Sequence, residues 1–159
     1  MKKFLNRHFA IAALFTIIAL SLSITPAMSH HSFAMYDQTK TITWTGVMTR
    51  FVAQANHAEM HFIPLGPDGK PMKAPNGEYI EWGVEMAGAA AMANQGVTVT
   101  TFPYRTIFSV SLNPLRDGKN FGSRTGPIYE CPKDTPPAAG KHCNSVKGGT
   151  QHGRGEFRE

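Results

Sequence analysis

Two adjacent histidines, His30 and His31, are the residues whose type and position indicate chemistry most directly in this sequence. They follow an apolar segment that ends at Ala27, Met28 and Ser29. If the chain is cut after Ser29, His30 becomes the N-terminus, and its free amine and ring nitrogen can chelate one metal ion. Such nitrogen donors favour Cu(II) under the Irving–Williams order. The alternative is that both histidines form a solvated chain end without a ligand.

A second set of candidate ligands occupies every second position of one segment, at His57, Glu59 and His61. In a strand these three side chains share a face. At ~3.3 Å per residue the two histidines lie roughly 13 Å apart, which is too far for a single metal ion. Either histidine can pair with Glu59, or one can join the chain end; an exposed polar face is the alternative. We expect His57 to join His30 and His31 in a site for copper or a similar divalent metal.

Other residues that could carry chemistry have simpler explanations. Six methionines after position 29 offer thioether ligands for Cu(I), but they are scattered over positions expected in the core. Arg116 precedes a turn in which Asp117 acts as a cap and Gly118 takes positive φ. The guanidinium of Arg116 suits a carboxylate or phosphate, although we expect a structural pair with Glu81 or Glu85.

No catalytic arrangement is visible in the sequence. Ser109 and Ser111 lie on a predicted strand without a nucleophile elbow, and no glycine-rich phosphate loop precedes a helix. Cys131 and Cys143 are too far apart for a redox pair. We therefore predict a non-catalytic binding protein, with a metal-free interaction module as the alternative. An oxidative copper enzyme is a third hypothesis, which requires an open coordination position and a substrate-binding surface.

The first 29 residues are typical of a secretory signal peptide. Lys2, Lys3 and Arg7 precede an apolar run of roughly 16 residues, and small residues follow it. This run is shorter than the ~20 residues that a membrane-spanning helix needs. We therefore expect export, cleavage and no stable membrane insertion afterwards; an anchor that is never removed is the alternative. Cleavage after Ala27 is a rival start, which would place His30 third.

The charge balance excludes one class of partner. The sequence has 159 residues, with 16 Lys and Arg against 11 Asp and Glu. The signal segment holds three of those cations, so the chain after Ser29 carries a net charge of only +2. We therefore expect no nucleic-acid partner, and an envelope protein or a small ligand remains.

The pattern after the signal segment predicts five strands and one short helix. Alternation of apolar and polar residues indicates four strands, and a fifth is delayed by Pro127, which cannot donate to a ladder. The five strands are expected at residues 40–51, 57–63, 79–86, 106–113 and 127–131. Alanine and methionine favour a helix within residues 87–95. This order predicts an all-β fold, a small five-stranded OB-like Greek-key barrel, with an open antiparallel sheet covered by a helix as the alternative.

The composition changes after Cys131. Cysteines of exported proteins form disulfides, so we expect Cys131 to pair with Cys143. The residues that follow are rich in Pro, Gly, Lys and Ser and cannot bury enough apolar surface to order themselves. The predicted organisation is therefore a signal peptide at 1–29, a β-barrel domain at 30–131 and a disordered, flexible tail at 132–159.

Three motifs of this chain are found together in one bacterial family. They are His-His-Ser-Phe at residues 30–33, Asn-His-Ala at 56–58 and Pro-Leu-Arg-Asp-Gly at 114–118. The chain resembles the exported proteins classified as domain of unknown function 6152, and the resemblance runs from His30 to about Ser123. It implies a secreted β-rich domain and implies no activity; the cleaved signal peptide predicts that the protein is periplasmic. The family usually has Pro before the His of the second motif, so we expect a looser turn here.

Overall fold

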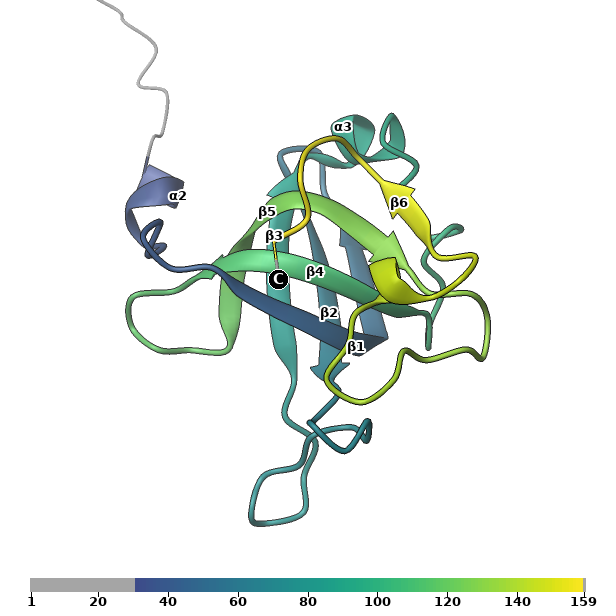
Figure 1. Cartoon of the computed structure of the whole chain (residues 1–159). Helices are drawn as coiled ribbons and strands as arrows, with labels where there is room; N and C mark the ends of the chain where they lie inside the picture. The colour runs from purple at the N-terminus through teal and green to yellow at the C-terminus, as the bar shows by residue number, and fades with distance from the viewer. Residues whose placement is uncertain (1–30, 159) are drawn as a thin grey trace, which may run out of the picture. The chain divides into compact units, whose positions relative to one another are not determined.

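The structure is a computed structural model that describes residues 31–158. The predicted signal peptide and His30 lie outside the described residues, and their roles stay predictions. None of the described helices is long and apolar enough to cross a membrane. The described elements, shown in Figure 1, are α2 (His31–Ala34), β1 (Ile42–Ala53), β2 (His57–Pro64), β3 (Trp82–Ala87), α3 (Ala89–Ala93), β4 (Ile107–Pro114), β5 (Phe121–Glu130), the 3₁₀ helix η1 (Cys143–Ser145) and β6 (Thr150–His152).

Strands β1 to β5 close into a barrel, because β3 and β5, at the two edges of this five-stranded sheet, pair with each other. The sheet order is β3-β2-β1-β4-β5-β6, and β3 additionally pairs with β5. That closing pair is parallel and runs from Gly83 opposite Phe121 to Glu85 opposite Ser123. The other strand pairs of the described chain are antiparallel. The predicted OB-like barrel is confirmed, and the alternative of an open sheet is wrong.

Alternate residues of each strand point into the barrel and form its core. In β2 the inward residues are Ala58, Met60 and Phe62, and all three are fully buried. Phe62 and Phe108 meet edge to face with ring centroids 5.2 Å apart, an arrangement that stabilises a core beyond the area it buries. The strict alternation in the sequence therefore predicted which face of β2 packs inward.

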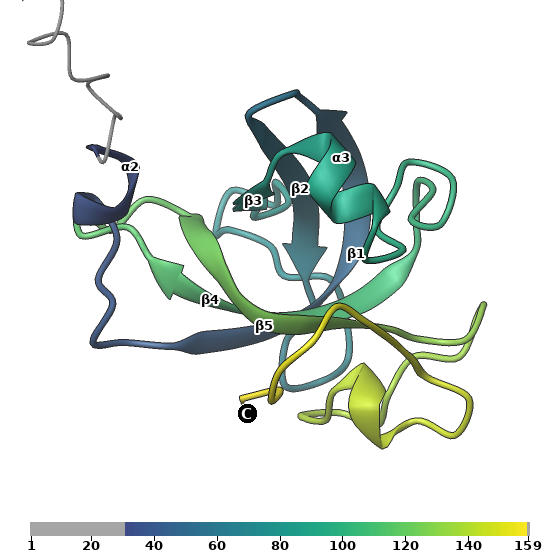
Figure 2. The ribbon, with the colours of Figure 1, turned by 90° about the horizontal axis from the view of Figure 1, so that it is seen from above.

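The short helix α3 lies at one end of the barrel, as Figure 1 and the view from above in Figure 2 both show. The backbone N–H of Ala89 donates to Gln54 O, which ties the helix to the turn between β1 and β2. Gly88 precedes α3, and a Cβ added there would lie 2.0 Å from Ala55 O. This close approach requires glycine. The helix is shorter than predicted because β3 runs to Ala87.

The fifth strand differs from its prediction. β5 begins at Phe121, whereas the sequence pattern placed the start at Pro127. The register with β4 shifts between Val110 and Ser111, which leaves Gly126 and Pro127 out of the ladder. Gly126 takes φ 67° there, as in a β-bulge. The bulge accommodates a proline that cannot donate a ladder hydrogen bond, so the strand continues on both sides of it.

The C-terminal residues also differ from their prediction, because they form ordered structure where we predicted a disordered tail. Residues 132–158, here called the C-terminal segment, lie on the outside of the barrel, and the predicted disulfide between Cys131 and Cys143 is confirmed. Further along, β6 pairs with β5, with Gln151 opposite Tyr129. The sequence argument counted only the apolar surface that the segment itself can bury. The barrel adds a covalent anchor and an unpaired strand edge, which order the segment.

Candidate functional site

Of the three predicted metal ligands, His57 is the one with a described side chain. His30 lies outside the described residues, and His31 begins α2 without a described side chain. His57 begins β2, directly after the turn from β1, and its side chain is 50% exposed. The imidazole therefore lies at the surface, where a ligand can reach it.

Glu85 fixes the orientation of His57. His57 Nδ1 lies 2.7 Å from Glu85 Oε1, because β2 and β3 are antiparallel neighbours and both side chains are on the outer face. An ionised carboxylate can only accept a hydrogen bond, so Nδ1 carries the proton and the lone pair of the neutral ring is on Nε2. Metal-binding histidines use this arrangement, with a carboxylate behind the ring and the other nitrogen toward the metal.

The second carboxylate oxygen of Glu85 accepts a hydrogen bond from Tyr36, which lies in the chain before β1. The Tyr36 hydroxyl donates to Glu85 Oε2 at 2.5 Å, and the Tyr36 side chain is almost fully buried. Burial, together with the hydrogen bond and the negative charge of Glu85, raises the pKa of Tyr36 far above its usual value. Tyr36 is therefore a neutral donor at physiological pH. Glu85 consequently connects His57 to the segment around Tyr36, which lies six residues after the predicted ligand His30.

Backbone contacts hold the rest of residues 31–37, here called the N-terminal segment. The N–H of Asp37 donates to Pro114 O at 2.8 Å, and the N–H of Arg116 donates to Met35 O at 2.9 Å. Figures 1 and 2 both place α2 beside the turn that joins β4 to β5. The N-terminal segment therefore crosses the outside of the barrel at a defined place.

His61 is engaged differently from His57. Its Nε2 lies 3.0 Å from Glu59 Oε2, and Arg50 Nη2 approaches the same nitrogen at 3.2 Å. The side chain is only 14% exposed, and the Phe121 ring lies beside it. The predicted pair with Glu59 is therefore made by His61. Among the described residues no contact occupies Nε2 of His57.

The described residues do not form a complete metal site. Within residues 31–158, no three His, Cys, Asp or Glu side chains come together in a group that could hold a metal ion. The structure instead offers one imidazole, oriented by a carboxylate. By itself, this imidazole is not a full set of metal ligands.

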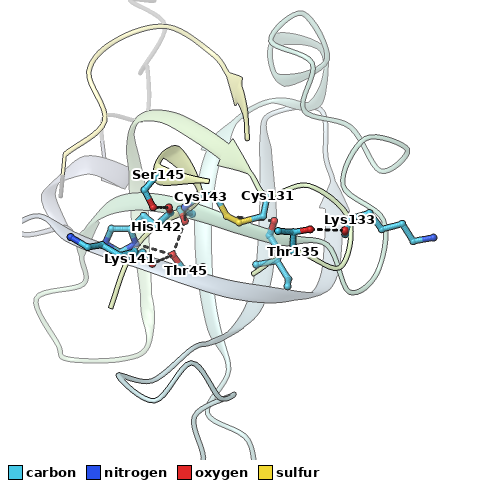
Figure 3. The surroundings of a disulfide bond; sticks show 10 residues. Thr45, Cys131, Lys133, Thr135, Lys141, His142, Cys143 and Ser145 are labelled. Carbon is cyan, nitrogen blue, oxygen red and sulfur yellow. Dashed lines mark hydrogen bonds between the residues drawn. A yellow bond between two sulfur atoms is a disulfide. The ribbon is translucent and has the colours of Figure 1, made fainter. Parts of the chain in front are cut away.

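The two histidines near the C-terminus have partners in the barrel. His142 Nδ1 lies 2.8 Å from Thr45 Oγ1 (Figure 3), and Thr45 also contacts Ser109 Oγ at 2.6 Å. His152 Nε2 lies 3.0 Å from Glu130 Oε2. These contacts attach the C-terminal segment to the barrel, and they explain both histidines without a metal.

The methionines divide into two groups. Most are buried in the core, as the sequence predicted. Met35 is 46% exposed, and Met72 is only partly buried. Both lie outside the strands of the barrel, where the alternating pattern that supports core packing does not extend. The buried methionines are Met48, Met60, Met86 and Met92.

Sequence reasoning missed Tyr36 and Glu85 as residues of the site. Both lie within the stretch that resembles the family, but a contact between them depends on where the N-terminal segment crosses the barrel. The expected partners of Arg116 also differ. Glu81 accepts from the Thr49 hydroxyl and Glu85 from Tyr36. The Nε of Arg116 instead donates to a backbone carbonyl of α2.

A family model matches most of the barrel. The match is to a family of unknown function (DUF6152) and covers residues 18–124. The chain belongs to this family. The DUF6152 match includes Tyr36, His57 and Glu85 and ends within β5, before Cys131. A comparison with curated proteins gives no match, and neither does a comparison with solved structures.

Proposed function

We propose that this DUF6152 protein is an exported, non-catalytic metal-binding protein, in which a mature N-terminus at His30 binds copper together with His31 and His57. The observation that carries the proposal is the hydrogen-bonded chain from Tyr36 through Glu85 to His57. It orients one imidazole and anchors the N-terminal segment at the same carboxylate. Copper is favoured because amine and imidazole nitrogens are donors that it prefers.

The hydrogen bond between Tyr36 and Glu85 limits how far His30 can lie from the His57 imidazole. Tyr36 is six residues from His30. An extended chain spans at most ~3.6 Å per residue, so His30 stays within roughly 22 Å of the anchor. The helical turn of α2 shortens this reach. The proposed site requires the terminal amine and ring of His30 to reach His57 within this limit.

Export is part of the proposal, because the site depends on a newly formed terminus. The first 29 residues have the composition of a signal peptide. The disulfide between Cys131 and Cys143 fits an oxidising compartment such as the periplasm. Removal of the signal there would create the amine of His30 in the compartment where the protein folds.

The experiment is a competitive Cu(II) titration of protein that starts at His30, as verified by intact mass. We expect one tight site. His30→Ala removes the ring that chelates the metal together with the terminal amine and should abolish that site, and His57→Ala should weaken it. Glu85→Gln should reduce the affinity about 10- to 100-fold, because a neutral amide replaces the carboxylate that orients the ligand.

His61→Ala is the matched control, since it removes the same side chain from the same face of β2 and should leave the affinity unchanged. Imidazole and amine must both lose protons to coordinate, so the affinity should fall as the pH is lowered through about 6.5. The proposal fails if His30→Ala and the native protein bind Cu(II) equally weakly. It also fails if His57→Ala and His61→Ala have the same effect.

A metal-free interaction module of the cell envelope is the second candidate. It is supported by Phe33 and Met35 of the N-terminal segment, which are 59% and 46% exposed. Neighbouring exposed apolar side chains are typical of contact surfaces. In this case Phe33→Ser should weaken binding of an envelope partner, and the Cu(II) affinity should not depend on His57.

A further inference from the structure

A pocket of about 410 Å³ lies between the start of β1 and the turn that joins β4 to β5. Its apolar walls include Ile42, Trp82 and Leu115. Ile42 and Trp82 are only partly buried against the core, so some of their apolar surface remains open. The volume falls within the range of roughly 300–1,000 Å³ that is typical of sites for small molecules.

Three cations, Lys40, Arg116 and Lys119, line the same pocket. Two of them are already paired, because Lys40 Nζ lies 3.3 Å from Asp37 Oδ2 and Lys119 Nζ lies 2.9 Å from Asp117 Oδ2. Side-chain hydrogen bonds lower the pKa of both aspartates, which are therefore ionised at neutral pH. The two pairs are neutral overall, and the excess positive charge of the pocket lies on Arg116.

The Nε of the Arg116 guanidinium is hydrogen-bonded within the protein, and its two Nη atoms remain available to a ligand. Its Nε donates to Ala34 O at 3.2 Å, which sets its orientation relative to the N-terminal segment. Among the described residues no carboxylate pairs with it. The donors on its two Nη atoms match two oxygens of a carboxylate or phosphate in a bidentate geometry. A guanidinium beside the apolar side chains of Ile42 and Trp82 is suited to a ligand that has both an anionic and an apolar part.

We propose that this pocket binds a small organic anion. The carboxylate or phosphate of the ligand takes the Nη atoms of Arg116, and its apolar or aromatic body lies against Trp82 and Ile42. Lys40 and Lys119 have side chains that are 71% and 77% exposed, so either can turn toward a further oxygen. This site is independent of the metal proposal, because none of its residues is a proposed copper ligand.

The test uses metal-free protein in the presence of a chelator and follows the indole N–H resonance of Trp82 by NMR. Phenylphosphate and benzoate supply an anion with an aromatic body, inorganic phosphate supplies the anion alone, and benzyl alcohol supplies the body alone. Both aromatic anions should bind saturably. Inorganic phosphate should bind more weakly than phenylphosphate, and benzyl alcohol about 10- to 100-fold more weakly than benzoate, because it lacks the charge-assisted hydrogen bonds.

Arg116→Gln should weaken the binding of both aromatic anions about 10- to 100-fold. Arg105→Gln is the matched control, because it makes the same change of charge before the start of β4, at the other end of that strand. It should leave binding unchanged, and a well-dispersed spectrum shows that each variant is folded. The proposal is overturned if benzyl alcohol binds as tightly as benzoate or if the two variants behave alike. Absence of binding by both aromatic anions at millimolar concentration would also overturn it.

Discussion

The two ends of the described chain lie on the outside of the same barrel, but they are attached by different physical means. The N-terminal segment is held by hydrogen bonds, chiefly from the buried Tyr36 hydroxyl to Glu85. The C-terminal segment is held by the disulfide between Cys131 and Cys143 and by the pairing of β6 with β5. One attachment therefore depends on a carboxylate, and the other on a covalent bond.

This difference indicates which end of the molecule can respond to its surroundings. A metal ion on His57 would act on the same carboxylate that holds Tyr36, because Glu85 contacts both side chains. The disulfide is buried, and neither of its sulfurs titrates. We therefore expect the N-terminal attachment to be adjustable and the C-terminal attachment to be permanent in an oxidising compartment.

Loss of the disulfide should have the largest effect on stability. Replacing Cys131 and Cys143 together by alanine opens a loop whose ends are 12 residues apart. The chain-entropy model gives a loss of about 3 kcal/mol in the free energy of unfolding. Urea unfolding of the native and variant proteins measures this difference. An unchanged free energy would mean that β6 and the polar contacts alone hold the C-terminal segment.

Tyr36→Phe tests the N-terminal attachment and should have a smaller effect. It removes the donor to Glu85 Oε2, and the expected loss is about 2 kcal/mol in the free energy of unfolding. The amide of Asp37 should also exchange faster, because its bond to Pro114 O belongs to the same attachment. Tyr79→Phe is the control, since Tyr79 is 56% exposed. Equal effects of the two substitutions would contradict the role of the Tyr36 hydroxyl.

Thr45→Val tests the polar contacts beneath the C-terminal segment. The Thr45 hydroxyl is buried and contacts Ser109 Oγ and His142 Nδ1. Its removal should lower the free energy of unfolding by about 1 kcal/mol. Thr49→Val, on the same strand, removes an exposed hydrogen bond to Glu81 and should cost less. The reverse order would show that the buried contacts contribute little.

Raising the pH from 7 to 10 should produce the smallest change in the free energy of unfolding. The raised pKa of Tyr36 means that the folded protein keeps its proton where an unfolded tyrosine, with a pKa near 10, loses it. Stability is therefore fully present below pH 10 and decreases as the pH rises, by about 0.4 kcal/mol at pH 10 itself. The difference between the native protein and Tyr36→Phe should shrink over this range. A difference that is constant up to pH 11 would contradict the assignment.

The barrel could be predicted from the sequence, because strands with one buried face show their alternation directly. β2 is the clearest case, with Met60 and Phe62 inward and His57 and His61 outward. β5 was predicted too short, because a bulge at Pro127 interrupts its pattern. A bulge is a property of the pairing between two strands, and one strand's sequence does not contain it.

The site could be predicted only in part. The sequence indicated His57 through its place in a motif, and the structure places it beside a carboxylate at the surface. The partners Tyr36 and Glu85 are 49 residues apart in the sequence. Their contact results from the path of the N-terminal segment over the closed barrel, which no local pattern records. The order of the C-terminal segment was missed for the same reason.

The central claim is that the mature N-terminus and His57 bind one copper ion. The most direct measurement is an NMR spectrum of ¹⁵N-labelled protein that starts at His30, recorded with and without one equivalent of Cu(II), which broadens nearby resonances. We predict selective broadening of the amides of His57 and of Ala87, which pairs with it across β2 and β3, while the amide of Gln151 in β6 stays sharp. If His57 and Ala87 stay sharp with Cu(II) bound, or if broadening centres on His152, the claim is contradicted.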